Sequence, residues 1–101
     1  MIRLMSEVDH ILATLRAVLP ELRQRWPIRK LAVFGSVARG DAEPASDLDV
    51  LVEFAEPVTL SAFLALEEEL SGLSGRSVDL VSRPALKPFI GQQIASEAIP
   101  V

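Results

Sequence analysis

The sequence predicts a small α/β (α+β) domain in which a mixed β-sheet is flanked by helices. Segments with apolar residues at three- and four-residue spacing, typical of amphipathic helices, alternate with short apolar runs of strand length. Their order along the chain is helix, strand, strand, helix, strand, helix, which favours a mixed sheet covered by helices. Because the chain has 101 residues, we expect one domain that spans residues 1–101.

The first helix is expected to begin at Ser6, which serves as its N-cap while Asp9 completes a variant of the capping box. It is expected to end near Leu19, because Pro20 fits best as the first position of a new helical piece over residues 21–25. The apolar residues at helical spacing are Val8, Ile11, Leu12, Leu15, Leu19 and Leu22.

The remaining elements follow from the same patterns. Strands are expected in residues 30–35, 47–54 and 76–82, and a loop in 40–45. A helix is expected within residues 57–75, with Thr59 or Ser61 as its N-cap and with Gly72 and Gly75 at its end. A last helix is expected at about residues 89–98, with Ile90 and Ile94 buried.

The helix expected within residues 57–75 carries Leu60, Phe63 and Leu64. These side chains could supply an interface with a partner protein. Apolar residues at helical spacing more often lie in the core, however, so we favour burial for them.

Composition limits the classes of function. Half of the residues are hydrophobic and 24% are charged, as in globular proteins. The chain has no cysteine and one histidine, His10, which excludes disulfides, thiolate sites and histidine metal clusters. No apolar run approaches the ~20 residues of a membrane span, and the N-terminus lacks a signal-peptide core. We therefore expect a soluble, cytoplasmic protein with no membrane partner.

The charge distribution argues against direct binding of a polynucleotide. The formal net charge is −4, and the ten lysines and arginines are scattered from Arg3 to Lys87. A protein that grips a nucleic-acid backbone usually has a basic face. A local basic patch formed by folding stays open at this point.

Asp47 and Asp49 are separated by one residue at the start of an apolar strand. Because side chains alternate across a strand, both are expected on one sheet face, whereas Leu48 and Val50 point to the other. Asp79 has a comparable place in the third strand. If the two strands are neighbours, a register that brings Asp79 beside Asp47 and Asp49 gives three carboxylates in one cluster.

Such a cluster is costly, because like charges raise one another's pKa and oppose folding. A divalent cation relieves this repulsion, and oxygen ligands suit Mg²⁺ better than zinc. Carboxylates around two metal ions about 3.5–4 Å apart are a recurring arrangement in phosphoryl and nucleotidyl transfer. The three acids Asp47, Asp49 and Asp79 therefore fit a site for divalent metal ions such as Mg²⁺.

Gly35 and Ser36 lie where the preceding strand ends. A strand that ends in this way can present backbone N–H groups and a hydroxyl to phosphate oxygens, and Arg39 adds a cation nearby. Simpler interpretations exist, since Gly-Ser is a common turn and Asp-x-Asp can serve in capping. The turn is not a Walker A loop, because no Lys-Ser/Thr pair follows. Aspartate-nucleophile phosphatases carry Asp-x-Asp after the apolar run, whereas here the run follows the pair.

The segment "GSVARGDAEPASDLDVLVEF" resembles the signature of the DNA polymerase β-like nucleotidyltransferase superfamily. In that signature Gly-Ser is followed, after ten residues, by Asp-x-Asp at the start of a strand. The acid in "SVDLVS" falls where the superfamily has its third carboxylate. The chain is similar to the minimal nucleotidyltransferases, specifically the MntA-type antitoxins of HEPN/MNT toxin–antitoxin pairs. The resemblance implies the polymerase β palm-like fold.

The resemblance also implies roles for these residues. The implied catalytic residues and metal ligands are Asp47, Asp49 and Asp79. Asp47 and Asp49 are implied to hold both Mg²⁺ ions and the nucleotide phosphates, and Asp79 to share the catalytic metal and help to deprotonate the acceptor hydroxyl. The residues implied to bind the β- and γ-phosphates are Gly35, Ser36 and Arg39. Ser46, just ahead of the acids, is expected to shape the loop.

In the antitoxin family, AMP from ATP is transferred to a tyrosine of the partner HEPN toxin, a ribonuclease, and pyrophosphate leaves. The resemblance therefore implies a hetero-oligomer with such a toxin. Larger members of the superfamily carry extra acceptor-binding domains, and we expect none here. The acceptor is therefore expected to be delivered by another protein or to bind weakly in an open cleft. Two alternatives stay open. One is an antitoxin that neutralises its partner by binding alone, and the other is nucleotidyl transfer to a small molecule or an RNA end.

Overall fold

A computed structural model describes residues 6–83 and 88–101 of the chain. The elements are α1 (Glu7–Arg25), β1 (Ile28–Phe34), α2 (Gly35–Arg39), β2 (Leu48–Phe54), α3 (Leu60–Ser74), β3 (Val78–Ser82), α4 (Pro88–Glu97) and β4 (Ile99–Pro100). No helix in these two ranges is long and apolar enough to cross a membrane.

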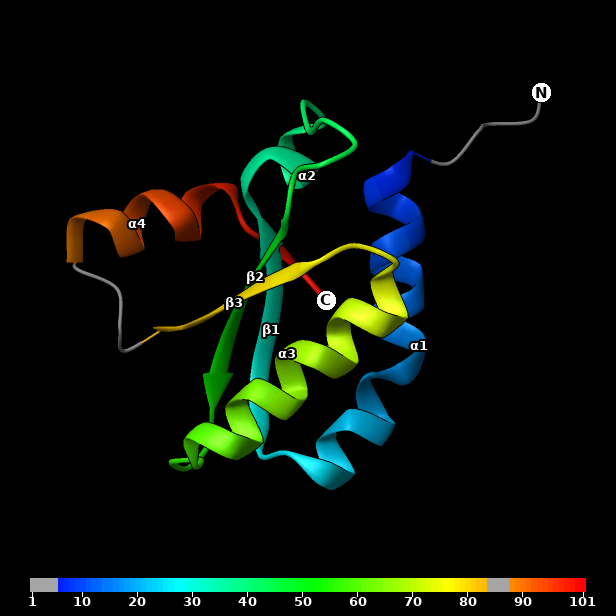
Figure 1. Ribbon diagram of the computed structural model, residues 1–101. Coiled ribbons are helices and arrows are strands. Elements are labelled where there is room, and N and C mark those ends of the chain that lie inside the picture. The colour runs from blue at the N-terminus through cyan, green and yellow to red at the C-terminus, as the bar shows by residue number, and fades with distance from the viewer. Residues whose placement is uncertain (1–5, 84–87) are drawn as a thin grey trace.

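Within the described residues the strands form one sheet in the order β3-β2-β1-β4 (Figure 1). Strand β1 pairs antiparallel with β2 and β4, whereas β2 pairs parallel with β3. The parallel pair is joined through α3, because parallel neighbours need a crossover connection. The predicted mixed sheet flanked by helices is confirmed. The structure adds α2 and β4, which are too short for a periodic pattern to reveal.

The hydrophobic core lies on one face of the sheet, where α1 and α3 pack together (Figure 1). Alternate residues of the central strand β2 point into it, and Leu48, Val50 and Val52 have no exposed surface. The other face of β2 carries Asp49 and Glu53 with Leu51 between them, as the alternation of a strand requires. The core and the predicted acids therefore occupy opposite faces of the same strand.

Helix α1 is continuous through Pro20, so the prediction of a break there is wrong. A proline inside a helix costs about 3 kcal/mol through a lost hydrogen bond and a clash with the preceding turn. Packing on both sides of the proline offsets this cost, because Leu15, Leu19 and Leu22 are all buried. The predicted capping box between Ser6 and Asp9 is present.

Helix α3 begins as predicted, with the Thr59 hydroxyl accepting a hydrogen bond from the Ala62 N–H at 3.1 Å. It ends at Gly75, whose φ of 74° is left-handed, a conformation that favours glycine. Gly72 lies inside the helix, so the prediction that it helps to end α3 is wrong. Helix α1 is joined to α3 by Trp26, whose indole Nε1 donates to the Ala62 carbonyl at 2.9 Å.

The outward side of α3 differs from our expectation. Leu60 is 72% exposed and Leu64 is 50% exposed, so the prediction that they belong to the core is wrong. Phe63 is half-buried. The core needs only one stripe of this helix, which Leu66 and Leu70 supply with no exposed surface.

Helix α4 lies close to its predicted position. Ile94 is half-buried rather than buried, and the Ile90 side chain lies outside the described residues. The chain after α4 forms β4, in which Ile99 and Pro100 pair with Val33 and Ala32 of β1.

The outer edge of β3 is covered by side chains of α3. The Val78 N–H donates to the Ser71 hydroxyl at 3.0 Å, and the Leu80 N–H donates to the Glu67 carboxylate at 2.9 Å. Four residues of a helix rise about 6 Å and two residues of a strand about 6.6 Å. The two spacings match, so one face of α3 serves both amides.

Candidate active site

Two of the three predicted acids lie side by side. Asp49 of β2 and Asp79 of β3 are partners in the parallel pairing, and neighbouring strands lie about 4.8 Å apart. Both side chains leave the sheet on the face opposite to Leu48 and Val50. The prediction that Asp79 lies beside Asp49 on a neighbouring strand is confirmed.

Asp47 precedes β2, which begins at Leu48, so the prediction that the strand includes Asp47 is wrong by one residue. The Leu48 N–H donates to the carbonyl of Ser77 at 2.8 Å. This bond fixes the point where the two parallel strands meet. Asp47 is exposed at that point.

Asp49 is the half-buried member of the group. Burial raises the pKa of its carboxyl, and the negative charges of Asp79 and then Asp47 raise the pKa further, whereas the Arg39 guanidinium lowers it. All three acids therefore share one electrostatic environment, and a bound cation would be favoured there.

The three carboxylates do not converge in advance. Within residues 6–83 and 88–101, no group of three or more His, Cys, Asp or Glu side chains is arranged to hold a metal ion. The register brings Asp79 beside Asp49, and the three-carboxylate metal site stays a prediction. Asp47 and Asp79 are exposed, and like charges that water can solvate are more stable apart. The donor chemistry still fits a hard cation such as Mg²⁺, because the acids around Asp49 offer oxygen ligands.

Gly35 makes room for Asp49. It follows the last residue of β1, Phe34, which is paired with Asp49. A Cβ atom built on Gly35 would lie 3.0 Å from Cγ of Asp49 and closer still to its Oδ2, and the φ of Gly35 is +76°. Both the close approach and the left-handed backbone require glycine. The sequence predicts phosphate binding for Gly35 and gives no sign of this contact.

Ser36 and Arg39 lie in α2, a five-residue helix where the sequence predicted a turn. Ser36 is half-buried in its first turn, and Arg39 is exposed. The Arg39 guanidinium contacts Asp41 and Glu97, both at 3.4 Å, and exposed pairs of this length are weak. Arg39 is near enough to Asp49 to lower its pKa, and its weak pairs leave it available to other anions.

Arg76 is a residue near the site that no sequence pattern indicates. Its side chain is 12% exposed and donates to both carboxylate oxygens of Glu7 at 2.8 Å and to the carbonyl of Ser46 at 2.6 Å. The Ser46 hydroxyl in turn accepts from the Glu43 N–H at 3.0 Å, which confirms that Ser46 shapes the loop. Because Ser46 directly precedes Asp47, Arg76 anchors the loop that carries this acid.

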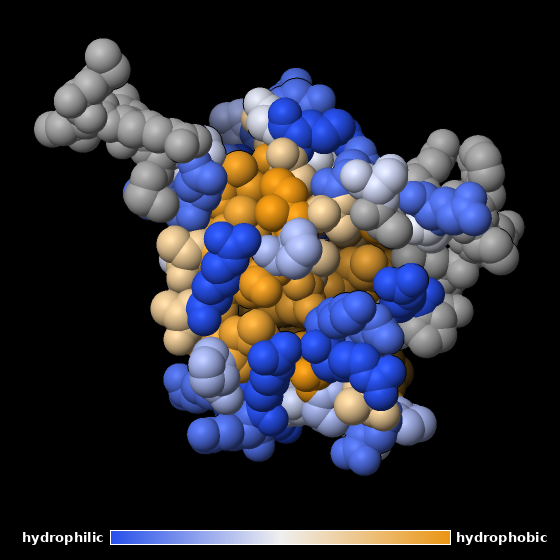
Figure 2. All heavy atoms as spheres, turned by 180° about the vertical axis from the view of Figure 1, so that it is seen from behind, coloured by the Kyte–Doolittle hydropathy of each residue, from blue (hydrophilic) through white to orange (hydrophobic). Residues whose placement is uncertain are grey.

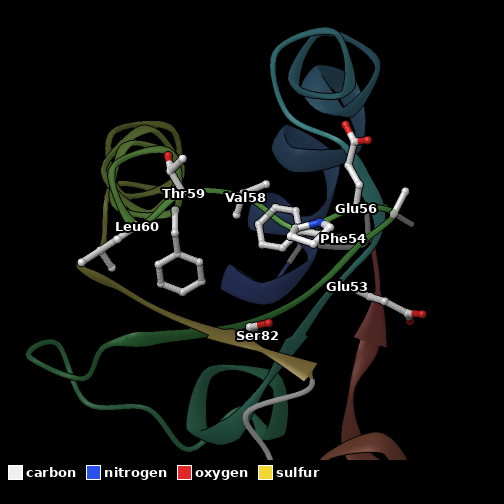
Figure 3. A pocket seen from close by; sticks show the side chains of 10 residues that line it. Glu53, Phe54, Glu56, Val58, Thr59, Leu60 and Ser82 are labelled. Carbon is white, nitrogen blue, oxygen red and sulfur yellow. The ribbon is translucent and has the colours of Figure 1, made fainter.

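A pocket of about 610 Å³ lies at the opposite end of β2. Phe54, Val58, Leu60 and Ser82 contribute to its walls (Figure 3). None of the three predicted acids lines it. The pocket is therefore separate from the candidate active site.

Comparison with known proteins decides the family. The family model of the nucleotidyltransferase domain matches residues 15–101, which is most of the chain. The chain belongs to the nucleotidyltransferase family. The resemblance inferred from the acids and the Gly-Ser pair is thereby confirmed.

The relatives of this nucleotidyltransferase include characterised and solved proteins. It is 41% identical over 95 residues to protein adenylyltransferase MntA of Thermococcus cleftensis, a match that covers 94% of this chain and 96% of the relative. It is 43% identical to a solved minimal nucleotidyltransferase, with a TM-score of 0.80 and coverage of 96% of this chain and 97% of that one.

A more distant neighbour is the MNT antitoxin complex with a tri-AMPylated HEPN toxin of Shewanella oneidensis. The identity is 21%, the TM-score is 0.66, and the match covers 89% of this chain and 70% of that chain. At this identity the likeness shows the fold alone.

Proposed function

We propose that this nucleotidyltransferase is a Mg²⁺-dependent protein adenylyltransferase. It transfers AMP from ATP to a tyrosine of a partner HEPN ribonuclease toxin, releases pyrophosphate and thereby acts as an antitoxin. The single observation that carries the chemistry is the register of Asp49 and Asp79, which places two carboxylates side by side on the sheet face next to α2. The relative named protein adenylyltransferase, which matches over nearly its whole length, supports the substrate class.

The proposed roles follow the positions of the side chains. Asp47, Asp49 and Asp79 would hold two Mg²⁺ ions, which when bound neutralise phosphate charge and polarise the α-phosphate. The N–H groups at the start of α2, the Ser36 hydroxyl and Arg39 would bind the β- and γ-phosphates. This would leave the α-phosphate nearest the acids.

The transfer itself needs an acceptor oxygen aligned with the leaving group. The tyrosine oxygen forms a bond to the α-phosphorus, and the bond from that phosphorus to pyrophosphate breaks. Asp79 accepts the hydroxyl proton, which its exposed position permits. Asp49 is held in place by its fit against Gly35, so the metal-binding side of the site is the more rigid one.

The partner assignment draws on the antitoxin complex of the structural neighbour. In that complex an MNT antitoxin is bound to an AMPylated HEPN toxin. We extend this arrangement to the present chain because its fold agrees with that of the antitoxin. The half-buried Asp49, whose pKa is raised, is more consistent with catalysis than with a module that only binds.

The test is incubation with a candidate HEPN partner, α-labelled ATP and Mg²⁺, followed by mass measurement of both proteins. We expect the partner to gain the mass of AMP on tyrosine. Asp47→Ala should abolish the transfer and leave the fold intact, whereas Asp41→Ala, a nearby exposed acid outside the triad, should retain it. Labelling by the Asp47→Ala variant would contradict the assigned metal role.

Thermal unfolding gives a readout that does not depend on activity. Mg²⁺ with ATP should raise the melting temperature, because a ligand that binds only the folded state stabilises it by about 2.7 kcal/mol at a hundredfold excess over Kd. The shift should be much smaller in Asp47→Ala. An unchanged melting temperature of the wild type at millimolar Mg·ATP would count against the site, even if toxin binding persists.

A further inference from the structure

A pocket of about 420 Å³ lies on the same sheet face as Asp49, and its apolar lining includes Ala32, Leu51 and Val101. Ala32 and Leu51 are cross-strand partners. Leu51 follows Asp49 by two residues, which is about 7 Å along the strand. The pocket therefore begins one pleat away from the candidate active site.

Basic side chains gather around this pocket. Its charged lining residues are Arg23, Arg29, Lys30, Arg83 and one acid, Glu53. The chain has ten lysines and arginines against fourteen acids, so four cations around one pocket are a strong local excess. Cations that are scattered along the sequence are brought together by folding, and the pairing of β1 with β2 helps to build this basic patch.

The positive charge is available to an incoming group. Arg29 and Arg83 face Glu53 at 3.5 and 3.8 Å and are 56% and 57% exposed, so both pairs are weak. Lys30 is exposed, and among the described residues no ion pair involves it. Seen from behind, the molecule has hydrophobic side chains gathered centrally with hydrophilic ones around them (Figure 2).

We propose that this pocket and its basic rim, here called the basic pocket, are the docking surface for the acceptor protein. The occupant is a protein segment that places aliphatic side chains over Ala32 and Leu51 and acidic side chains against Lys30 and Arg29. This inference rests on the proposed function, because an acceptor must bring a hydroxyl to the acids. A segment that binds in the basic pocket can bring its hydroxyl to the acids, because Asp49 lies on the same face of the sheet.

The lining favours a protein over a nucleic acid. Proteins that bind single strands usually stack bases on aromatic side chains, and the described residues of this lining include none. The apolar floor suits aliphatic side chains, and the rim suits carboxylates. The whole chain is acidic, with a net charge of −4, so a partner with an acidic segment is steered to this face rather than elsewhere.

A rival surface exists on α3. Leu60 and Leu64 are exposed, and Leu60 lines the pocket shown in Figure 3. That pocket includes Phe54, which lies five residues and about 17 Å along β2 from Asp49. A partner docked there would have to span this distance to reach the acids, so we assign the docking to the basic pocket.

The experiment measures binding of the candidate HEPN partner by calorimetry. Lys30→Glu is expected to weaken binding about tenfold or more, and added salt should weaken wild-type binding. Arg25→Glu is the matched control, because Arg25 pairs with Glu69 of α3, away from the basic pocket. Arg25→Glu should change the affinity less than about twofold, because the exposed ion pair that it removes contributes little free energy.

Acetylation of lysines in the wild-type protein gives a second measurement that needs no variant. Lys30 should react in the free chain and be protected in the complex. In AMP transfer, Lys30→Glu should raise KM for the acceptor and leave kcat unchanged, which a general loss of folding would not do.

The outcomes separate this inference from the proposed function. If the wild type transfers AMP while Lys30→Glu binds normally and Lys30 stays reactive in the complex, the docking surface is overturned and the function stands. If no AMP is transferred but Lys30→Glu weakens binding, the function fails and the docking surface stands. Three further results would overturn the docking surface. They are loss of binding in Leu60→Asp with Lys30→Glu unaffected, binding of a ribo-oligonucleotide that Lys30→Glu abolishes, and a dimer of the free chain that Lys30→Glu dissociates.

Discussion

The two faces of strand β2 carry side chains of opposite character. One face carries Leu48, Val50 and Val52, which have no exposed surface. The other carries Asp49, whose pKa is raised by burial and by neighbouring acids, with Leu51 and Glu53. Residues adjacent in sequence therefore have different roles, according to the face on which they lie. The inner face stabilises the fold, and the outer face accepts an electrostatic cost that a metal–nucleotide complex would relieve.

This comparison explains why acids tolerate a place beside the core. An isolated buried carboxylate would neutralise instead of staying charged. Asp49 differs from such a group in two ways. It is only half-buried, and the Arg39 guanidinium lies near enough to favour its charged form. Stability supplied by the inner face is what lets the outer face keep like charges together.

The largest effect is expected from Asp49→Asn. Because one charged ligand is lost, AMP transfer to the partner should fall about a thousandfold, which corresponds to about 4 kcal/mol in the barrier. The free energy of unfolding at pH 7 should stay equal or rise, since the substitution removes a half-buried charge from between Asp47 and Asp79. Initial rates measure the effect on transfer, and urea unfolding measures the effect on stability. A marked loss of stability would contradict the view that the outer face of β2 does not stabilise the fold.

Leu48→Ala changes the residue before Asp49 on the opposite face. Truncation of a fully buried leucine should lower the free energy of unfolding by about 3 kcal/mol. Transfer per folded molecule should remain near that of the wild type, as measured well below the melting temperature. A selective loss of activity in a fully folded variant would show that the two faces are coupled.

Gly35→Ala tests the contact between α2 and Asp49. The added methyl would displace the Asp49 carboxylate, and a misplacement of about 1 Å can cost about a hundredfold in rate. Gly40→Ala is the matched control. Gly40 has a similar φ of +81°, yet an added Cβ there has nothing within 4 Å. Both variants should lose about 1–3 kcal/mol of stability through backbone strain, but only Gly35→Ala should lose transfer.

The smallest effect is the pH dependence of stability contributed by Asp49. Its pKa in the folded state lies above the ordinary value of 3.8, so the folded state binds more protons between the two values. Stability from this group is therefore gained as the pH falls through the folded pKa and is lost as the pH rises. The difference in unfolding free energy between wild type and Asp49→Asn, measured from pH 7 to pH 4, should shrink. A constant difference would contradict the raised pKa.

The parts of the fold that could be predicted rest on local periodicity. Alternation along each strand predicted which side chains share a face with Asp49 or with Asp79. That the two strands are neighbours in this register was only a condition of the prediction, and the structure supplies it. The continuous α1 could not be predicted in the same way, since whether Pro20 breaks a helix depends on packing against the rest of the core.

Long-range contacts explain the other differences. Arg76 reaches Ser46 and Glu7 across 30 and 69 residues, and nothing in the local sequence indicates those partners. The exposure of Leu60 and Leu64 likewise depends on which stripe of α3 the sheet selects. The fit of Gly35 against Asp49 required the pairing of β1 with β2, which motif spacing alone does not contain.

The edge of β3, where Ser71 and Glu67 of α3 receive the outward N–H groups of Val78 and Leu80, limits how this protein can associate. An uncovered edge strand invites another chain to extend the sheet by backbone pairing. Here the amides are already engaged, so fibre-like stacking and strand exchange are disfavoured along this border. Recognition at this border is left to side-chain chemistry, which can be tuned for one partner in a way that generic backbone pairing cannot.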